Sequence, residues 1–257
     1  MSDDNFSGLK DNFISHLVEL RTRLVRASAV VLVVFIVLFA IWPGAAAIYD
    51  ILAKPMMNAL PEGSKMIATG VITPFMVPMK VTMMVALMIS LPWVLYQAWA
   101  FVAPGLYMHE KRLVAPLIVS SSVLFLLGVG FCYYFVFGTV FKFINDFAPK
   151  SISVAPDIEN YLDFVITMCL AFGITFEVPV VVIVLVRMGL VTVEKLKEIR
   201  PYVIVGAFVI AAVVTPPDIM SQLFLAVPLC LLYEIGLILA PLFERVTKAP
   251  EDTPDSV

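Results

Sequence analysis

Four ionisable side chains lie inside or at the edges of long apolar stretches of this sequence: Lys80, Glu177, Asp218 and Glu234. A charged group at the depth of a lipid bilayer costs about 3 kcal/mol or more, so such residues typically mark binding sites, ion pathways or contacts between helices. These four positions are the first candidates for chemistry.

Glu177 lies in the middle of an apolar stretch, two residues before Pro179. A proline inside a helix removes one backbone hydrogen bond and kinks the helix. Two interpretations of Glu177 stay open. It is either a polar point on a concave face that meets a substrate or partner helix, or a protonated carboxyl that bonds to a neighbouring helix and holds the bundle together.

Asp218 follows Thr215-Pro216-Pro217 and precedes another apolar stretch, which is the position of a helix N-cap. Gln222 is one turn further along, so Thr215, Asp218 and Gln222 also form a polar patch that suits a polar residue of another helix. The two roles are compatible. For Glu234 the sequence favours snorkelling or helix packing over a site, and for Lys80 it favours snorkelling.

Glu19 lies in an amphipathic stretch whose apolar residues recur at helical spacing and is followed by Arg21 and Arg23. From composition alone, Glu19 is a surface carboxylate paired with these arginines, an interaction worth less than about 1 kcal/mol. Glu110, beside Lys111 and Arg112, has the same interpretation.

The elements that must position these residues are transmembrane helices. The chain is 61% hydrophobic and only 14% charged, whereas a soluble domain carries about 25% charged residues. Lipid must therefore cover part of the apolar surface. The net charge of −3 gives no basic bias and argues against nucleic acid as a partner.

Cysteine and histidine spacing predicts neither a metal centre nor a cofactor. Cys132, Cys169 and Cys230 lie singly in apolar stretches, and neither His16 nor His109 has the context of a zinc site. We expect no catalytic residues, so the protein is predicted not to be an enzyme.

The apolar stretches predict an all-α membrane protein with six spans. A span needs about 20 apolar residues, because the hydrocarbon core is about 30 Å thick. The predicted spans are 24–42, 74–96, 113–137, 161–188, 202–214 and 219–239. They form one domain over 1–245, expected to be a concave bundle with short fifth and sixth helices, followed by a disordered cytoplasmic tail over 246–257.

The fifth span covers only 202–214 and is followed at once by the Thr215–Asp218 turn. Thirteen residues make a helix of roughly 20 Å, about 10 Å short of a normal hydrocarbon core. We therefore expect a locally thinned membrane beside the fifth and sixth spans.

Lys and Arg residues indicate the orientation, because they gather in cytoplasmic loops. They concentrate in both tails, before the third span and before the fifth span, whereas the opposite loops carry only Lys54, Lys65, Lys142 and Lys150. Both termini are thus predicted to be cytoplasmic, as an even number of spans requires.

Five ordered segments resemble the TatC family, the core subunit of the twin-arginine protein translocase. They are Phe13–Leu24, Tyr96–Arg112, Phe172–Pro179, Arg200-Pro201-Tyr202, and Thr215–Asp218 with Ser221-Gln222. The resemblance covers the chain apart from its two tails.

The resemblance implies a multi-pass protein of the bacterial inner membrane that binds the paired arginines of signal peptides at its cytoplasmic face. It implies work with TatA and TatB, single-span partners, in moving folded proteins with the proton-motive force, and a homo-oligomer within a receptor complex. Lipid surrounds it, and no cofactor is implied.

The resemblance also assigns residues. Glu19 and Glu110 match the arginine-binding carboxylates, with Phe101 and Arg21 nearby. Glu177 is matched with the apolar part of the signal peptide. Arg is planar and always charged, so a carboxylate binds it in a bidentate way that Lys cannot reproduce.

Further positions are implied for partners. Thr215, Gln222 and Asp218 match the contact with the transmembrane helix of TatA or TatB, and Pro55 matches a position linked to assembly.

Two other functions are compatible with parts of the sequence. A proton-coupled small-molecule transporter would use Glu177 and Asp218 as relay groups and needs a continuous polar cavity. An intramembrane protease needs a Ser/His or paired-Asp arrangement at membrane depth, which the predicted spans lack.

Overall fold

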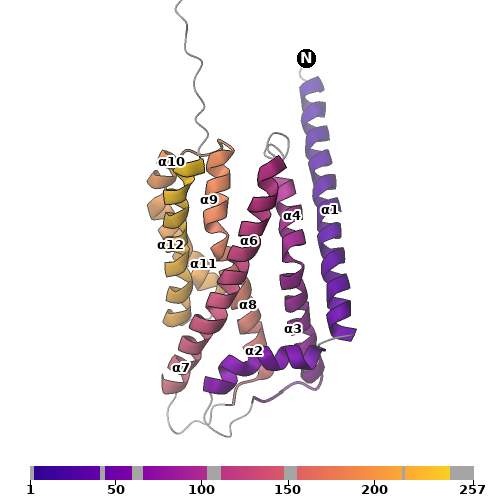
Figure 1. The fold of residues 1–257 in the computed structure, drawn as a ribbon, viewed down its shortest axis with the longest axis vertical. Helices are drawn as coiled ribbons and strands as arrows, with labels where there is room; N and C mark the ends of the chain where they lie inside the picture. Colours follow the sequence, from indigo (N-terminus) through magenta and orange to yellow (C-terminus); the bar gives the residue numbers. More distant parts are fainter. Residues whose placement is uncertain are drawn as a thin grey trace, which may run out of the picture.

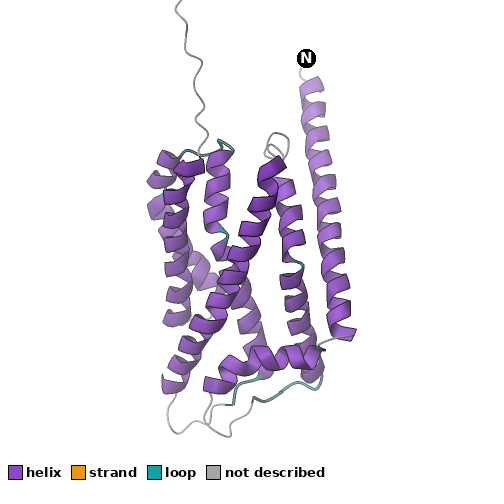
Figure 2. Cartoon of the chain, viewed as in Figure 1, coloured by secondary structure: helices purple, strands orange, loops and turns teal. Residues whose placement is uncertain are grey.

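The structure, a computed structural model, describes residues 3–40, 44–59, 66–102, 111–147, 155–215 and 218–243 and is helical throughout these ranges apart from short connections (Figures 1 and 2). The predicted tail over 246–257 lies outside them. The elements are α1 (Asp3–Ala40), α2 (Ala45–Ala59), α3 (Thr73–Ile89), α4 (Leu91–Val102), α6 (Lys111–Phe131), the π-helical turn η1 (Cys132–Val136), α7 (Phe137–Phe147), α8 (Ile158–Phe176), α9 (Val178–Arg187), α10 (Val193–Glu198), α11 (Arg200–Val214) and α12 (Ile219–Phe243).

Four stretches of the described chain are long and apolar enough to cross a bilayer: 14–40, 115–144, 158–187 and 219–242. The pair α3 and α4 makes a fifth if it counts as one span. The remaining apolar helix, α11, has 15 residues. The all-α membrane fold is confirmed, whereas the count of six spans depends on α11 and stays a prediction.

The second span differs from the single helix predicted over 74–96. It bends by 61° between α3 and α4, at Ser90, and α4 continues to Val102. Pro92, the second residue of α4, has no N–H with which to continue the hydrogen-bond ladder of α3, which is a common cause of a sharp kink.

The sixth helix is not short, so that part of the prediction is wrong. α12 has 25 residues, or about 37 Å at helical rise. Its apolar pattern continues through Pro228 and Pro241 to Phe243. These prolines do not end the helix, because neighbouring helices can satisfy the backbone groups that a proline leaves free.

The core forms where α8 packs between the other spans. Its buried residues recur at helical spacing, with Leu162, Val165, Met168 and Phe172 fully inaccessible. α6 approaches α8 at two glycines: a side chain at Gly128 would meet the Phe172 backbone at 2.5 Å, and one at Gly173 would meet the Phe125 ring at 2.5 Å. Small residues of this kind let membrane helices pack closely.

One end of the bundle is closed by α2, which lies across the spans in Figure 1. The hydroxyls of Tyr133 and Tyr161 donate to the α2 carbonyls of Ile51 and Leu52 at 2.7 and 2.9 Å. At the same end, the Ile67 N–H donates to the Pro156 carbonyl, and the Ile158 N–H donates to the Ile67 carbonyl, both at 2.9 Å. We refer to this end as the α2 cap.

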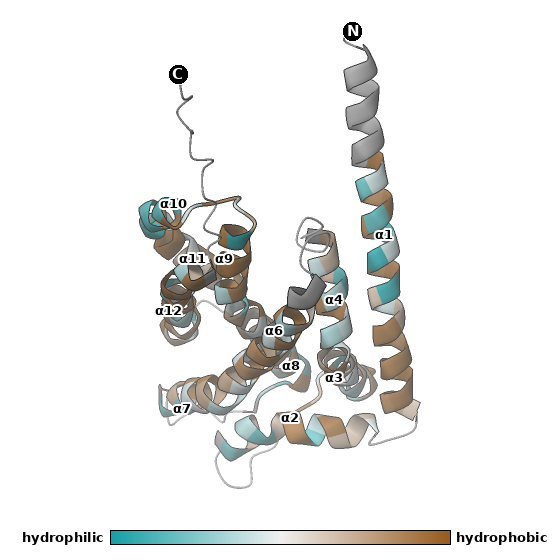
Figure 3. Ribbon diagram, turned by 45° about the horizontal axis from the view of Figure 1, so that its top comes forward, coloured by the Kyte–Doolittle hydropathy of each residue, from teal (hydrophilic) through white to brown (hydrophobic). Residues whose placement is uncertain are grey.

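The opposite end carries the start of α1 and the end of α12 (Figure 1). It also carries the basic residues Arg187, Lys195, Lys197 and Arg200, at the end of α9, in α10 and at the start of α11. We call it the basic end. In Figure 3 the middle turns of α1 are mixed in hydropathy, and its last turns, toward α2, are hydrophobic.

Candidate functional site

The Glu19 carboxylate on α1 holds an arginine side chain. Its Oε1 accepts hydrogen bonds from Arg23 Nε at 2.8 Å and from Arg23 Nη2 at 2.6 Å. The two residues are one helical turn apart, and 41% of the Glu19 side chain remains exposed. The predicted pairing of Glu19 with a neighbouring arginine is confirmed, and the partner is Arg23.

Phe101 joins this group from α4. Its ring stacks on His16, with centroids 4.3 Å apart and an interplanar angle of 14°. His16 Nδ1 lies 3.8 Å from Glu19 Oε2. The structure thus brings together Glu19 and Phe101, which the sequence placed at one site from segments about 80 residues apart.

Arg23 also reaches toward α4, where its Nη1 lies 3.5 Å from Gln97 Oε1. Between α1 and α4 an apolar hollow of about 230 Å³ is lined by residues that include Leu20, Arg23, Gln97 and Phe101. Gln97 is buried. Sequence reasoning missed it, because its partner lies 74 residues away.

The other residues predicted for this site are less defined. Arg21 is exposed, and because it follows Glu19 by two positions, it points to another side of α1. Glu110 lies outside the described residues, directly before α6 begins at Lys111.

Glu177 is buried at the break between α8 and α9, 9% exposed. It ends α8, and Pro179 is the second residue of α9, so the predicted interruption at this proline is confirmed. Glu177 lines an apolar pocket of about 270 Å³ with Trp99 of α4 and Val181 of α9.

Neither carboxylate oxygen of Glu177 makes a hydrogen bond to any described residue. The Ser121 hydroxyl of α6 accepts a hydrogen bond from Trp99 Nε1 at 3.1 Å. An interhelical hydrogen bond to Glu177 was one of the two open interpretations, and the described residues supply none.

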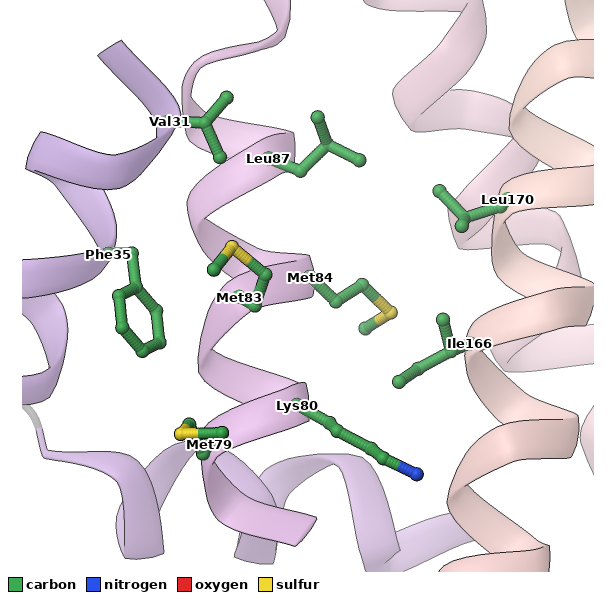
Figure 4. Close-up of a pocket in the computed structure, with 9 residues that line it drawn as sticks. All are labelled: Val31, Phe35, Met79, Lys80, Met83, Met84, Leu87, Ile166 and Leu170. Carbon is green, nitrogen blue, oxygen red and sulfur yellow. The ribbon is translucent and has the colours of Figure 1, made fainter. Parts of the chain in front are cut away.

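A wider groove lies between α1, α3 and α8 and is shown in Figure 4. It has a volume of about 650 Å³. The side chains of Met79, Met83 and Met84 stand along it, and Lys80 extends from α3 toward α8 at one end. Methionine side chains are flexible and polarisable, so such a groove adapts to apolar segments of different shape.

Lys80 makes ion pairs with α8 rather than snorkelling alone. Its Nζ lies 2.9 Å from Asp163 Oδ1 and 3.3 Å from Glu159 Oε1. Glu234 is likewise paired, because its Oε1 lies 2.6 Å from Arg200 Nε. Both residues therefore hold helices together, which agrees with the helix-packing role that the sequence favoured for Glu234.

The patch at the start of α12 has the predicted cap. Asp218 Oδ1 accepts a hydrogen bond from the Ser221 N–H at 2.7 Å. The other two members bond to α11: the Thr215 hydroxyl donates to the Ala211 carbonyl at 2.9 Å, and Gln222 Nε2 donates to the Phe208 carbonyl at 3.3 Å. Of the three side chains, Gln222 connects α12 to α11, whereas Asp218 and Thr215 cap their own helices.

The three cysteines are free, with Cys132 and Cys169 buried. Among the residues that the structure describes, no group of histidine, cysteine or acidic side chains is arranged to hold a metal ion. Pro55 lies within α2, in the α2 cap.

These features define a helical membrane protein. At its basic end the partly exposed carboxylate of Glu19 binds an arginine, and the carboxyl of Glu177 is buried within a span. Residues 15–228 match the family model described as Sec-independent protein translocase protein (TatC). The chain belongs to the TatC family.

Similar proteins agree with this assignment. The chain is 48% identical to the Sec-independent protein translocase protein TatC of Haemophilus influenzae, over 90% of this chain and 89% of that protein. It is 46% identical to the protein of the same name from Escherichia coli K12, over 87% and 85% of the two chains.

Among solved structures, a crystal structure titled twin arginine translocase receptor TatC superposes with a TM-score of 0.77 at 38% identity, over 90% of this chain and all of that chain. The protein is therefore a membrane component of the twin-arginine protein translocation system. This membership favours protein transport over the transporter and protease alternatives.

Proposed function

We propose that the chain binds the paired arginines of twin-arginine signal peptides through Glu19 and Glu110, with Phe101 and Arg21 beside them. The proposal rests on the two hydrogen bonds that Glu19 Oε1 accepts from the Arg23 guanidinium, at 2.6 and 2.8 Å. A carboxylate that already holds one guanidinium in this geometry suits the guanidinium of a ligand.

The energies permit an exchange of partners. An exposed pair four residues apart on a helix is worth about 0.3–0.5 kcal/mol, whereas a charge-assisted hydrogen bond to a bound ligand contributes about 1.5–3 kcal/mol. When an arginine of the ligand replaces Arg23 as the partner of Glu19, the Arg23 guanidinium still has the Gln97 side chain beside it. Arg23 Nη1 lies 3.5 Å from Gln97 Oε1.

The apolar part of the signal peptide has two surfaces beside this site. Ala98 of α4 lines both the hollow next to Arg23 and the pocket of Glu177. The groove of Figure 4 offers a further apolar surface between α1, α3 and α8. In this proposal Glu177 is a mid-membrane polar point that a peptide or partner helix contacts.

The remaining parts of the proposal concern orientation and partners. The basic end faces the cytoplasm with both termini, because lysine and arginine favour that side. Thr215, Asp218 and Gln222 contact the transmembrane helix of TatA or TatB, and Pro55 in the α2 cap contributes to assembly of several copies into a receptor complex. Transport is driven by the proton-motive force.

Equilibrium binding of synthetic signal peptides to the purified protein in nanodiscs tests the arginine site. We expect a peptide with Arg-Arg to bind at least tenfold more tightly than one with Lys-Lys, and Glu19→Gln to remove most of that difference. Glu194→Gln is the control, because it makes the same change of charge on an exposed residue of α10.

Glu110→Gln tests the second carboxylate in the same assay and is expected to weaken Arg-Arg binding as Glu19→Gln does. Equal binding of both peptides to the wild type, or full discrimination by both glutamine variants, would contradict the proposal.

A further inference from the structure

An apolar groove of about 480 Å³ lies between α6, α9 and α12. It is lined by Pro116 and Leu124 of α6, by Val180 and Ile183 of α9, and by the last turns of α12. Val181 and Leu185 line only the Glu177 pocket, whereas Val184 lines both cavities. The groove and the Glu177 pocket thus lie on adjoining faces of α9.

The length of this groove matches one leaflet of a membrane. On α6 it extends over the nine positions from Pro116 to Leu124, and on α9 over the nine from Pro179 to Arg187, which is about 12 Å at helical rise. Half of a hydrocarbon core is about 15 Å. A partner helix that spans the membrane needs a surface about twice as long, whereas a lipid acyl chain fits within the groove.

A charged residue lies at the end of the groove that is nearest the basic end of the bundle. Arg187 is the charged member of its lining, and it occupies the last turn of α9 at the basic end. α6 begins at the same end with Lys111 and Arg112. The planar guanidinium of arginine matches the geometry of a phosphate group, and basic pockets between membrane helices typically bind anionic headgroups.

We propose that this groove binds an anionic phospholipid, with an acyl chain against α6, α9 and α12 and the phosphate on Arg187. Lipid at this position fills the space between three helices and fixes the end of α9, whose adjoining face lines the Glu177 pocket. The leaflet is the cytoplasmic one if the proposed orientation holds, but the binding itself does not depend on it.

Native mass spectrometry of the full-length protein tests the headgroup. The protein is released from micelles that contain phosphatidylglycerol or phosphatidylcholine, and retained lipids are counted. We expect Arg187→Gln to weaken phosphatidylglycerol binding about tenfold, the loss of one charge-assisted hydrogen bond, and to leave phosphatidylcholine unchanged. Lys197→Gln, with the same charge change outside the groove, should bind as the wild type does. Equal losses in both variants would overturn the proposal.

Crosslinking locates the chain and needs no variant. Phosphatidylglycerol with a photoreactive group on its acyl chain should label α6 near 116–124 and α9 near 180–184 in the wild-type protein. Ile183→Trp, which fills the groove, should reduce that labelling while labelling of α1 persists. Labelling spread evenly over the lipid-facing helices would show that the groove has no preferred occupant and would refute the site.

Discussion

The Glu19 carboxylate accepts both of its hydrogen bonds from the guanidinium of Arg23, one turn further along the same helix. The exposed acidic group at the basic end is therefore already occupied by the kind of group that we propose as its ligand. Arg23 acts as an internal competitor, and its removal has an effect of predictable sign.

Arg23→Gln should bind an Arg-Arg signal peptide about twofold more tightly than the wild type, because the competing intrahelical pair is worth about 0.3–0.5 kcal/mol. Isothermal titration in nanodiscs measures the difference. Glu19→Gln is expected to act in the opposite direction. A loss of binding in Arg23→Gln as large as that in Glu19→Gln would mean that Arg23 itself contacts the peptide.

Glu177→Leu should make the protein more stable and less active. Both carboxylate oxygens are buried without a hydrogen-bond partner among the described residues, a condition that costs about 1–3 kcal/mol. We expect the thermal midpoint to rise by about 2–4 °C for each kcal/mol recovered while transport of a twin-arginine substrate falls. Val181→Leu, in the same pocket, is the control and should preserve transport. Unchanged transport in both Glu177→Leu and Glu177→Gln would remove the proposed mid-membrane role.

Acid should weaken the α2 cap through Asp157. The pKa of this carboxyl is lowered, first by the hydrogen bond that it accepts from the Thr69 hydroxyl and then by the hydrogen bonds that it accepts from backbone N–H groups. The ionised form is the stabilised one in the folded protein. Its contribution is therefore complete above the ordinary aspartate pKa of about 3.9 and is lost as pH falls through the lowered value.

The comparison of thermal midpoints for wild type and Asp157→Asn across this pH range tests the cap. We expect the variant to be less stable at neutral pH and the gap to close in acid. A gap that is constant with pH would assign the effect to packing rather than to charge.

The ion pair between Lys80 and Asp163 should stabilise the contact of α3 with α8 by about 0.5–1 kcal/mol, the upper range for partly exposed pairs. A double-mutant cycle with Lys80→Met and Asp163→Asn measures this coupling by reversible unfolding in detergent. The exposed pair Lys195–Glu198 within α10 serves as reference and should show smaller coupling. Equal values would mean that the Lys80 pair is no more than a surface contact.

The short α11 should thin the bilayer beside α12. Its 15 residues span about 22 Å, and mismatch costs only fractions of a kcal/mol per Å, which the bilayer can accommodate. Cryo-electron microscopy of the protein in a lipid nanodisc should show the headgroup layers closer together beside α11 than beside α1. Layers of uniform separation would contradict this prediction.

Local patterns predicted the features that depend on neighbours in the sequence. The length of an apolar stretch located α8, the Thr215–Asp218 turn ended α11 early, and Asp218 was identified as an N-cap from its place before an apolar stretch. Each of these depends on residues within a single stretch of the sequence.

Features that depend on distant partners were missed. Lys80 meets α8 residues 79 and 83 positions away, and Ser121 bonds to Trp99 from a different helix. The bend at Ser90 was also missed, although Pro92 is a local signal, because the apolar stretch continues across it and membrane helices tolerate prolines. The prediction of a short sixth helix failed because the apolar pattern continues beyond residue 239 to Phe243.

The π-helical turn at Cys132–Val136 has a consequence for chain length. Such a turn accommodates one residue more than an α-helical turn, which rotates everything after it by about 100° relative to a regular helix. Val140 and Phe141 of α7 reach the buried core only in this rotated register. Deletion of a single residue from the turn would swing them toward lipid, so the number of residues at 132–136 is constrained more strictly than their identities.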